Sequence, residues 1–277
     1  MRRATRPEVD VLIDWAAKEG WNPGVHDAEA FWRADHEGFY VSLLNGEMVS
    51  GISVVGCSDQ EPTAGFLGLY IVHPDHRGKG YGKALWDFAL SQAPYALIGL
   101  DGVVASQKNY ESEGFEYLYP QYRYHGVRLP GYRDPSLHPL ALAVIPDYVA
   151  LEHEVAGLHR PQFVRAWVES PKLEGDVLMD DLGAAAVGAI RPCRQGYKIG
   201  PLYANNPDQA RLLLDGLLSY ANGRDVYWDI PGPNTAAREI AESLGMTPMF
   251  ETARMWRGGV PPHRVESIYG VTTFELG

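Results

Sequence analysis

A glycine-rich loop constrains the fold of this chain more than any other feature. The apolar run Phe66–Val72 predicts a strand, and a helical pattern that reaches about Ala93 follows it, with Gly78, Gly80 and Gly82 between the two. Strand, loop and helix in this order place backbone N–H groups around the positive end of a helix dipole. Glycine leaves those N–H groups accessible because it has no Cβ. The loop therefore predicts a pyrophosphate site.

Two other kinds of phosphate loop do not fit. A Walker loop needs Ser or Thr directly after its lysine, and neither Lys79 nor Lys83 is followed by one. A dinucleotide loop has the spacing Gly-x-Gly-x-x-Gly, which this loop lacks. The pattern present is Arg-x-x-Gly-x-Gly, formed by Arg77, Gly80 and Gly82. It resembles the acyl-CoA pyrophosphate loop of the GNAT family (GCN5-related N-acetyltransferases), including the Val-x-Pro that commonly precedes it.

The order of predicted elements follows the GNAT layout over about residues 1–125, with a hairpin predicted at Asn45-Gly46. A segment rich in Gly, Pro and His at 126–139 is interpreted as a linker. Strand-helix-strand-helix-strand then recurs between residues 197 and 256, which suggests duplication. We expect an α/β fold of tandem GNAT-like domains, each a central mixed β-sheet flanked by helices. Residues 1–130 would be the acetyl-CoA-binding domain, and residues 131–277 a degenerate copy with an acceptor-site or structural role.

Composition restricts the partners and the compartment. The formal net charge is −11, which argues against a large surface for nucleic acid. No apolar run approaches membrane-spanning length and no signal peptide is recognisable, so we expect a cytoplasmic protein without a membrane partner. Cys57 and Cys193 are far apart, and the nine histidines form no ligand pattern, so no metal is expected.

The resemblance implies acetyl-CoA as cosubstrate and assigns residues to it. Backbone N–H groups near Tyr70–Val72 would polarise the acyl carbonyl. Tyr110 matches the tyrosine of the family's Tyr-x-x-x-Gly-Phe segment, whose hydroxyl protonates the leaving thiolate; packing on the sheet is the alternative role. The residues expected to bind the cofactor are Tyr70, Ile71, Val72, Arg77, Gly78, Lys79, Gly80, Tyr81, Gly82, Lys83 and Asn109.

The second half lacks both features of the first. Asn205-Asn206-Pro207-Asp208 replaces the glycine loop, and Ala241 stands at the tyrosine position. An aspartate near a helix start would also repel a pyrophosphate. We therefore expect one CoA site per chain, in the first half.

The acceptor site and the general base are the least defined parts. The strand before the loop carries no carboxylate. Asp27 is interpreted first as a helix cap, with substrate contact as the alternative. The residues expected to border the acceptor are His26, Asp27 and Glu29 in the first half, and Tyr203, Asn205 and Trp228 in the second.

The predicted function is transfer of an acetyl group from acetyl-CoA to a primary amine of a small molecule or peptide. One alternative is an acyl-CoA-binding regulator, or pseudoenzyme, without turnover. Another is an aminoacyl-tRNA-dependent tandem-GNAT transferase, against which both the acidic charge and the preserved CoA loop argue.

Overall fold

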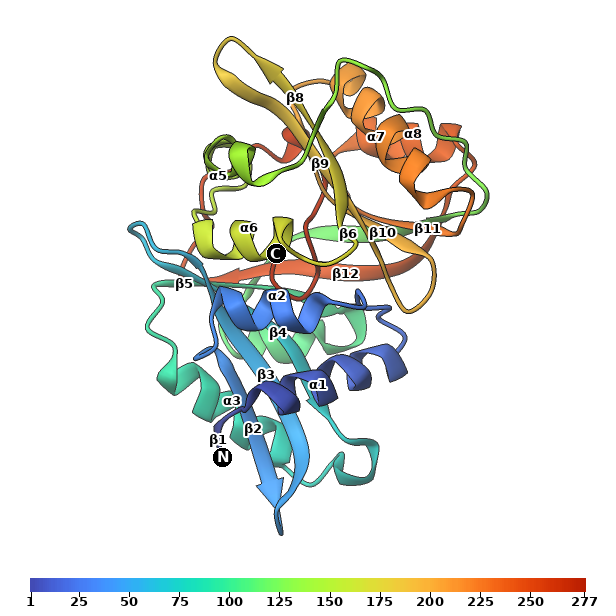
Figure 1. Ribbon diagram of the computed structural model, residues 1–277. Helices are drawn as coiled ribbons and strands as arrows, with labels where there is room; N and C mark the ends of the chain where they lie inside the picture. Colours follow the sequence, from blue (N-terminus) through green and yellow to red (C-terminus); the bar gives the residue numbers. More distant parts are fainter.

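The computed structural model describes residues 1–277 as two α/β halves joined through one continuous sheet (Figure 1). The strands are β1 (Arg2–Arg3), β2 (Phe39–Leu44), β3 (Glu47–Ser58), β4 (Ala64–Val72), β5 (Leu97–Val103), β6 (Glu116–Gly126), β7 (His138–Pro139), β8 (Glu174–Asp180), β9 (Gly183–Pro192), β10 (Tyr197–Ala204), β11 (Val226–Pro231), β12 (Thr247–Arg257) and β13 (Ile268–Gly270). The α-helices are α1 (Arg6–Lys18), α2 (Asp27–Ala34), α3 (Tyr81–Gln92), α4 (Gln107–Ser112), α5 (Ile145–Ala156), α6 (Pro161–Val168), α7 (Pro207–Ala221) and α8 (Thr235–Ser243).

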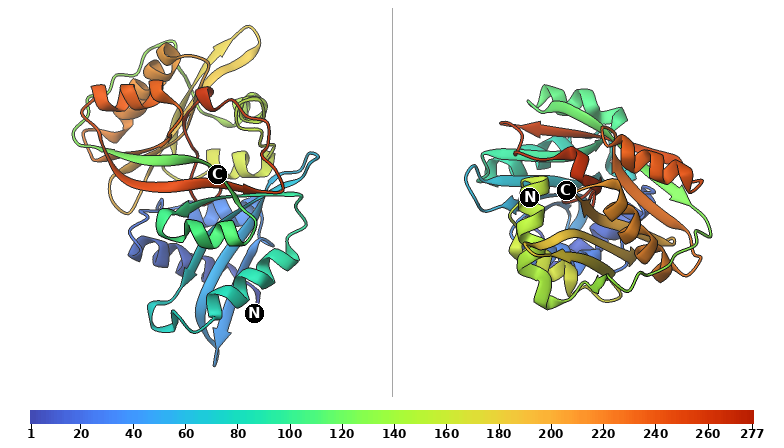
Figure 2. Two further views of the ribbon diagram at one scale, coloured as in Figure 1. Left: turned by 180° about the vertical axis from the view of Figure 1, so that it is seen from behind. Right: turned by 90° about the horizontal axis from the view of Figure 1, so that it is seen from above.

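The two halves exchange their last long strands. The sheet has the order β1-β2-β3-β4-β5-β12-β6-β11-β10-β9-β8-β7. β12, from the second half, lies between β5 and β6 of the first, and β6 in turn pairs with β11 of the second. Both strands cross the middle of the molecule in the front and rear views (Figures 1 and 2). Neither half of the sequence therefore holds a complete sheet by itself.

Local sequence signals correspond closely to the elements that form. Asn45 and Gly46 both have positive φ, 53° and 88°, as the tight turn between β2 and β3 requires. α7 begins with Pro207, directly after Asn206, whose side chain accepts a hydrogen bond from the Gln209 N–H. The apolar face of α7 packs in the core of the second half, where Leu213 and Leu217 are fully buried.

Helices cover both faces of the sheet in each half (Figures 1 and 2). In the first half, α1 and α2 share one core with Phe163 and Trp167 of α6, a helix that follows the linker in sequence. α3 packs on the opposite face, where Leu85 and Trp86 join the core formed with β3 to β5 and β12. The halves are thus joined by packing as well as by strand exchange.

The residues after β12, Gly258–Gly277, form a C-terminal tail that ends in the middle of the molecule (Figures 1 and 2). Every residue from Ser267 to Gly277 is buried. β13 lies within this tail and pairs antiparallel with β10. The sequence pattern predicts no element here, because three strand residues are too few to show a period.

No helix is both long and apolar enough to cross a membrane.

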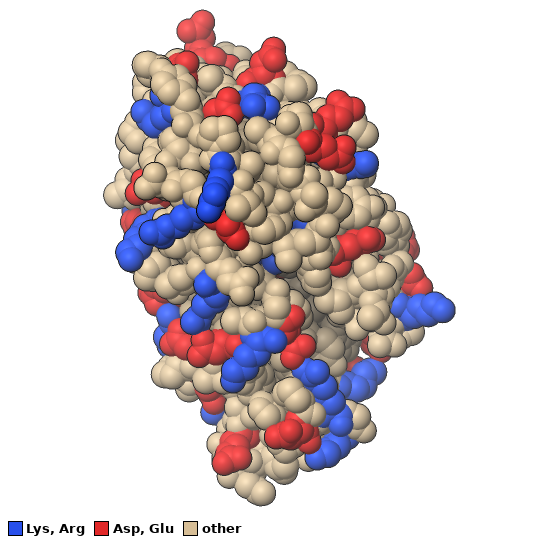
Figure 3. Space-filling model, turned by 90° about the vertical axis from the view of Figure 1, so that its right-hand side faces the viewer, with Lys and Arg blue, Asp and Glu red and all other residues tan.

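Acidic and basic side chains are interspersed over the face drawn in Figure 3 rather than separated into patches of one sign. That face therefore lacks the basic stripe that characterises a nucleic-acid site.

Candidate active site

The site begins where two parallel strands separate. β4 and β5 pair from Ala64↔Leu97 as far as Leu67↔Leu100, and each strand then continues without pairing to the other. Immediately after the last pair, Leu69 and Tyr70 together face a single residue of β3, Ile52, which makes a β-bulge. Leu69 has a φ of 48° at this position. A bulge re-aims backbone groups, so the N–H groups near Tyr70–Val72 remain the predicted donors to the acyl carbonyl.

A cavity of about 310 Å³ occupies the opening between β4 and β5. Tyr70, Ile71, Val72, Arg77 and Tyr110, which the sequence predicts as site residues, all line it. Its remaining walls are formed by Glu19, Trp21, Leu67, Gly68, Leu69, Leu100, Asp101, Gly102, Val103, Ser106, Arg123, Phe250, Thr252, Phe274 and Glu275.

Tyr110 lies between α3 and β5. Its ring stacks on Trp86 with a centroid separation of 5.6 Å, and Gly102 leaves room for it, since a Cβ there would lie 2.3 Å from Tyr110 Cε2. Burial raises the pKa of Tyr110, while Ser106 acts in the opposite direction. The phenol is therefore protonated at neutral pH and can donate to a thiolate in the cavity. Burial and the neighbouring Tyr110 also raise the pKa of Tyr70, to about 12.

The glycine loop has the geometry of an anion cradle. Gly78 and Gly80 have φ values of 72° and 84°, and a Cβ on either would meet no atom within 4 Å, so their backbone faces open space. Gly80 directly precedes the first residue of α3, where the helix dipole is positive. Gly82 has another role: a Cβ there would stand 2.6 Å from Tyr70 Oη and 2.9 Å from Val72 Cγ2. It allows α3 to pack closely on β4.

The basic side chains near the loop are engaged within the protein. Arg77 donates to the Val72 carbonyl at 3.0 Å and pairs with Glu19. Lys79 donates to the Asp75 carbonyl, and Lys83 contacts Asp87 and Glu113. These contacts are exposed and weak, so a pyrophosphate can compete for the three cations. Asn109 is exposed on α4, and Tyr81 is the first residue of α3.

We expect Gly80→Ala to weaken acyl-CoA binding, because a methyl group on this backbone would intrude on the cradle and a positive φ disfavours alanine. Isothermal titration calorimetry measures the effect. Gly46→Ala is the matched control, since Gly46 has a φ of 88° with open space around it but lies in the β2–β3 turn. Equal acyl-CoA affinity for the two folded variants would exclude the loop as the pyrophosphate site.

Comparison of the chain with known proteins leads to the same family that the loop motif indicates. Residues 7–115 match the model of the acetyltransferase (GNAT) family, and residues 148–270 match that of an acetyltransferase (GNAT) domain. The holothin acyltransferase of Pseudoalteromonas sp. (strain SANK 73390) is 30% identical over 276 residues, or 99% of this chain and 93% of that protein. The chain belongs to the GNAT acetyltransferase family. It is thus an acyltransferase of GNAT type, as the loop motif predicts.

Solved GNAT structures share the fold at low identity. A putative acetyltransferase from Pyrococcus horikoshii aligns with a TM-score of 0.81 and 19% identity, over 100% of this chain and 95% of that one. A tandem GNAT protein from the clavulanic acid biosynthesis pathway aligns with a TM-score of 0.61 and 14% identity, over 94% and 97% of the two chains. The predicted tandem GNAT fold class is confirmed.

The first-half residues predicted for the acceptor do not line the GNAT cavity. Asp27 is not the helix cap but the first residue of α2; its buried carboxylate accepts from the Gly24 N–H and pairs with both Nε and Nη2 of Arg191, at 2.8 and 3.0 Å. It is therefore a bridge between the halves. His26 stands at the N-cap, and Glu29 pairs with Arg6 on the surface.

The second-half residues predicted for the acceptor also lie elsewhere. Trp228 is fully buried in the core of the second half, and the Tyr203 hydroxyl belongs to a buried polar cluster with Glu152. Asn205 donates to the Ala185 carbonyl and accepts from Arg264. The expectation that these side chains face one acceptor cleft is corrected, because each is held by a long-range contact within the protein.

The corresponding opening of the second half is closed by the C-terminal tail. β10 and β11 pair in parallel from Tyr197↔Val226 to Ile199↔Trp228 and then separate, as β4 and β5 do. Here β13 pairs with β10, and the Val271 N–H donates to the Asp229 carbonyl of β11 at 3.0 Å. The β10 bulge also contains Pro201, which has no N–H to offer a carbonyl.

Proposed function

We propose that this GNAT protein transfers an acetyl group from acetyl-CoA to the amine of a small molecule, with the whole reaction in the cavity between β4 and β5. The observation that carries the proposal is the composition of that cavity. Its lining includes the β4 bulge and Tyr110, and also the aromatic residues Trp21, Phe250 and Phe274. The first group suits a thioester and the second a flat apolar acceptor.

The chemistry follows from the position of each group. Backbone N–H groups at the bulge stabilise the negative charge that develops on the thioester oxygen. The amine nitrogen attacks the carbonyl carbon, so that a C–N bond forms and the C–S bond breaks. Tyr110 gives its proton to the departing sulfur. The loop at Gly78 and Gly80 holds the pyrophosphate outside the cavity, which fixes the direction of entry.

The acceptor class is inferred from size and lining. A cavity of about 310 Å³ is at the lower end of small-molecule sites, and it is bounded by the C-terminal tail through Phe274 and Glu275. These features favour a small molecule over a peptide chain. The name of the Pseudoalteromonas relative points the same way, since holothin acyltransferase acts by its name on holothin. The aromatic residues in the cavity lining further favour a flat amine over an aliphatic polyamine.

The test is release of free thiol from acetyl-CoA, screened over arylamines, heteroaryl amines, aminosugars, polyamines, amino acids and peptide N-termini, with the product identified by mass. We expect thiol release that depends on an arylamine or heteroaryl amine and forms the N-acetyl product. Tight acetyl-CoA binding without transfer to any amine would instead support the regulator. Acetyl transfer restricted to peptide N-termini would contradict the small-molecule acceptor.

A further inference from the structure

Three acidic residues line the cavity, and the hydrogen bonds of their carboxylates differ. Glu19 pairs with Arg77. Asp101 receives both Nε and Nη2 of Arg254 at 2.7 Å, and Gln121 Nε2 donates to it as well. Glu275 is 3% exposed, and its Oε2 has no hydrogen-bond partner. No histidine lines the cavity. Glu19 is exposed, so Glu275 is the one buried carboxylate of the three that makes no ion pair with an arginine.

The backbone of Glu275 is fixed against the β4 bulge. A Cβ on Gly68, the residue just before Leu69, would lie 2.1 Å from the Glu275 carbonyl oxygen and 3.1 Å from its Cα. Gly68 thus gives the tail direct access to the strand that opens the site. This contact brings residue 275 next to the N–H groups expected to hold the thioester oxygen.

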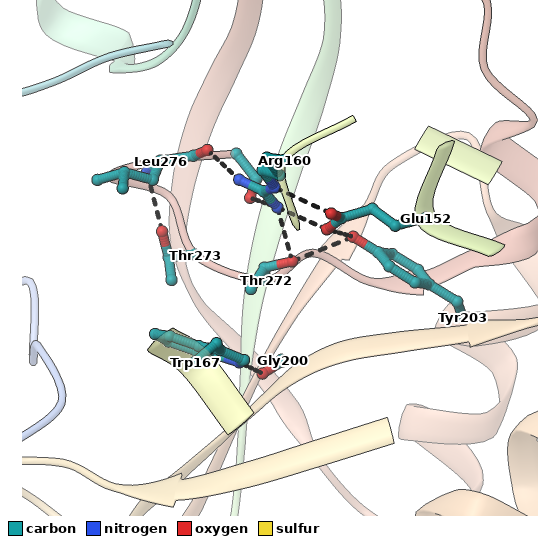
Figure 4. A network of polar contacts seen from close by, with 9 residues as sticks. Glu152, Arg160, Trp167, Gly200, Tyr203, Thr272, Thr273 and Leu276 are labelled. Carbon is teal, nitrogen blue, oxygen red and sulfur yellow. Dashed lines mark hydrogen bonds and ion pairs between the residues drawn. The ribbon is translucent and has the colours of Figure 1, made fainter. Parts of the chain in front are cut away.

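Both ends of the tail segment around Glu275 are anchored. Upstream, β13 pairs with β10, and the Asn234 side chain donates to three tail carbonyls, with the shortest distance, 3.0 Å, to Ile268. Downstream, Arg160 donates to the Leu276 carbonyl at 2.7 Å (Figure 4). It also donates to the Gly277 carbonyl at 3.0 Å. Arg160 is itself held by Glu152.

Glu275 lies among buried charged groups near the tail. The cations there are Arg123, Arg191 and Lys198. Asp229 pairs with the first and Asp27 with the second, whereas Lys198 Nζ contacts only the Trp21 carbonyl, at 3.4 Å. Burial and the neighbouring Arg123 lower the pKa of Lys198, while Asp229 and, to a smaller extent, Glu275 act against this change. Glu275 is thus one of the acidic groups that surround these buried cations.

We propose that Glu275 is the general base that takes the proton from the attacking amine, with the C-terminal tail as the element that delivers it. This inference rests on the proposed function. As the nitrogen bonds to the thioester carbon, its proton passes to the Glu275 carboxylate. The C–S electron pair leaves on sulfur, which takes the Tyr110 proton. Exchange with solvent then returns one proton to Tyr110 and removes one from Glu275.

The primary test is Glu275→Gln, which keeps the shape of the side chain and removes its basicity. We expect kcat to fall by about 10²–10⁴-fold, the usual worth of a general base, while the Kd for acetyl-CoA changes little. Glu266→Gln is the matched control, because Glu266 is an exposed carboxylate on the same tail without an ion pair. If chemistry limits the rate and the Glu275→Gln variant transfers the acetyl group as fast as the wild-type protein does, Glu275 is not the general base. The proposed function would still hold in that case.

A second variant separates proton transfer from packing. Glu275→Ala opens space for a small carboxylate, so formate added to the assay should restore part of the lost kcat. Tyr110→Phe should show no such recovery, since formate cannot replace a phenol proton donor. If both Glu275 variants lose acetyl-CoA binding and formate does not restore kcat, Glu275 has a structural role. That result would contradict the proposal. If wild-type protein transfers to no amine at all, the proposed function itself fails.

Discussion

Tyr110→Phe is expected to lower kcat by about 10²–10⁴-fold while acetyl-CoA binds almost as well as before. Phenylalanine keeps the stacking on Trp86 and the packing on Gly102, so only the hydroxyl group and its proton are lost. Single-turnover kinetics with acetyl-CoA and an accepted amine measures the chemical step directly.

Tyr117→Phe is a suitable control, because Tyr117 is 48% exposed on β6 and does not line the cavity. Both substitutions remove one tyrosine hydroxyl group, and they differ only in where that group lies. A Tyr110→Phe enzyme with the wild-type rate of chemistry would make Tyr110 a packing residue, which is the alternative that the sequence leaves open.

Arg160→Met is expected to lower the free energy of unfolding by about 3–5 kcal/mol, because it leaves Glu152 buried without its partner. The same change removes the donors that hold the Leu276 and Gly277 carbonyls, so kcat should fall as well. Denaturant unfolding followed by fluorescence gives the first quantity, and the thiol assay gives the second.

Arg165→Met provides the comparison in α6, the helix that follows Arg160. Arg165 pairs with Glu169 at the surface of α6, four residues apart, and such pairs contribute about 0.3–0.5 kcal/mol. Similar stabilities for the Arg160 and Arg165 variants would contradict the role of Arg160 as an anchor of the tail.

Much of the secondary structure can be predicted from sequence because its signals are local. The hairpin at Asn45-Gly46, the glycine loop and the start of α7 each depend on residues within one turn of the chain. Tyr110 and Arg77 are likewise found through spacing, and both line the cavity. Gly82 stays a predicted pyrophosphate contact, whereas its closeness to Tyr70 and Val72 arises only when α3 packs on β4.

The acceptor side could not be predicted because its contacts are distant in sequence. Asp27 and Arg191 are 164 residues apart, and nothing near Asp27 identifies a partner that turns it into a buried ion pair. β6 and β12 are predicted as strands, yet their exchange depends on register between the two halves. Glu275 lies beyond the last periodic segment, so only the path of the tail reveals it.

The central claim is that the first opening binds acyl-CoA and the tail closes the second. Calorimetric titration of the full chain with acetyl-CoA, followed by a crystal structure of the complex, tests it most directly. We predict one molecule per chain, with its pyrophosphate at Gly78 and Gly80 and its sulfur within hydrogen-bond reach of the Tyr110 hydroxyl. Two molecules per chain, or one bound between β10 and β11 with β13 displaced, would contradict the claim.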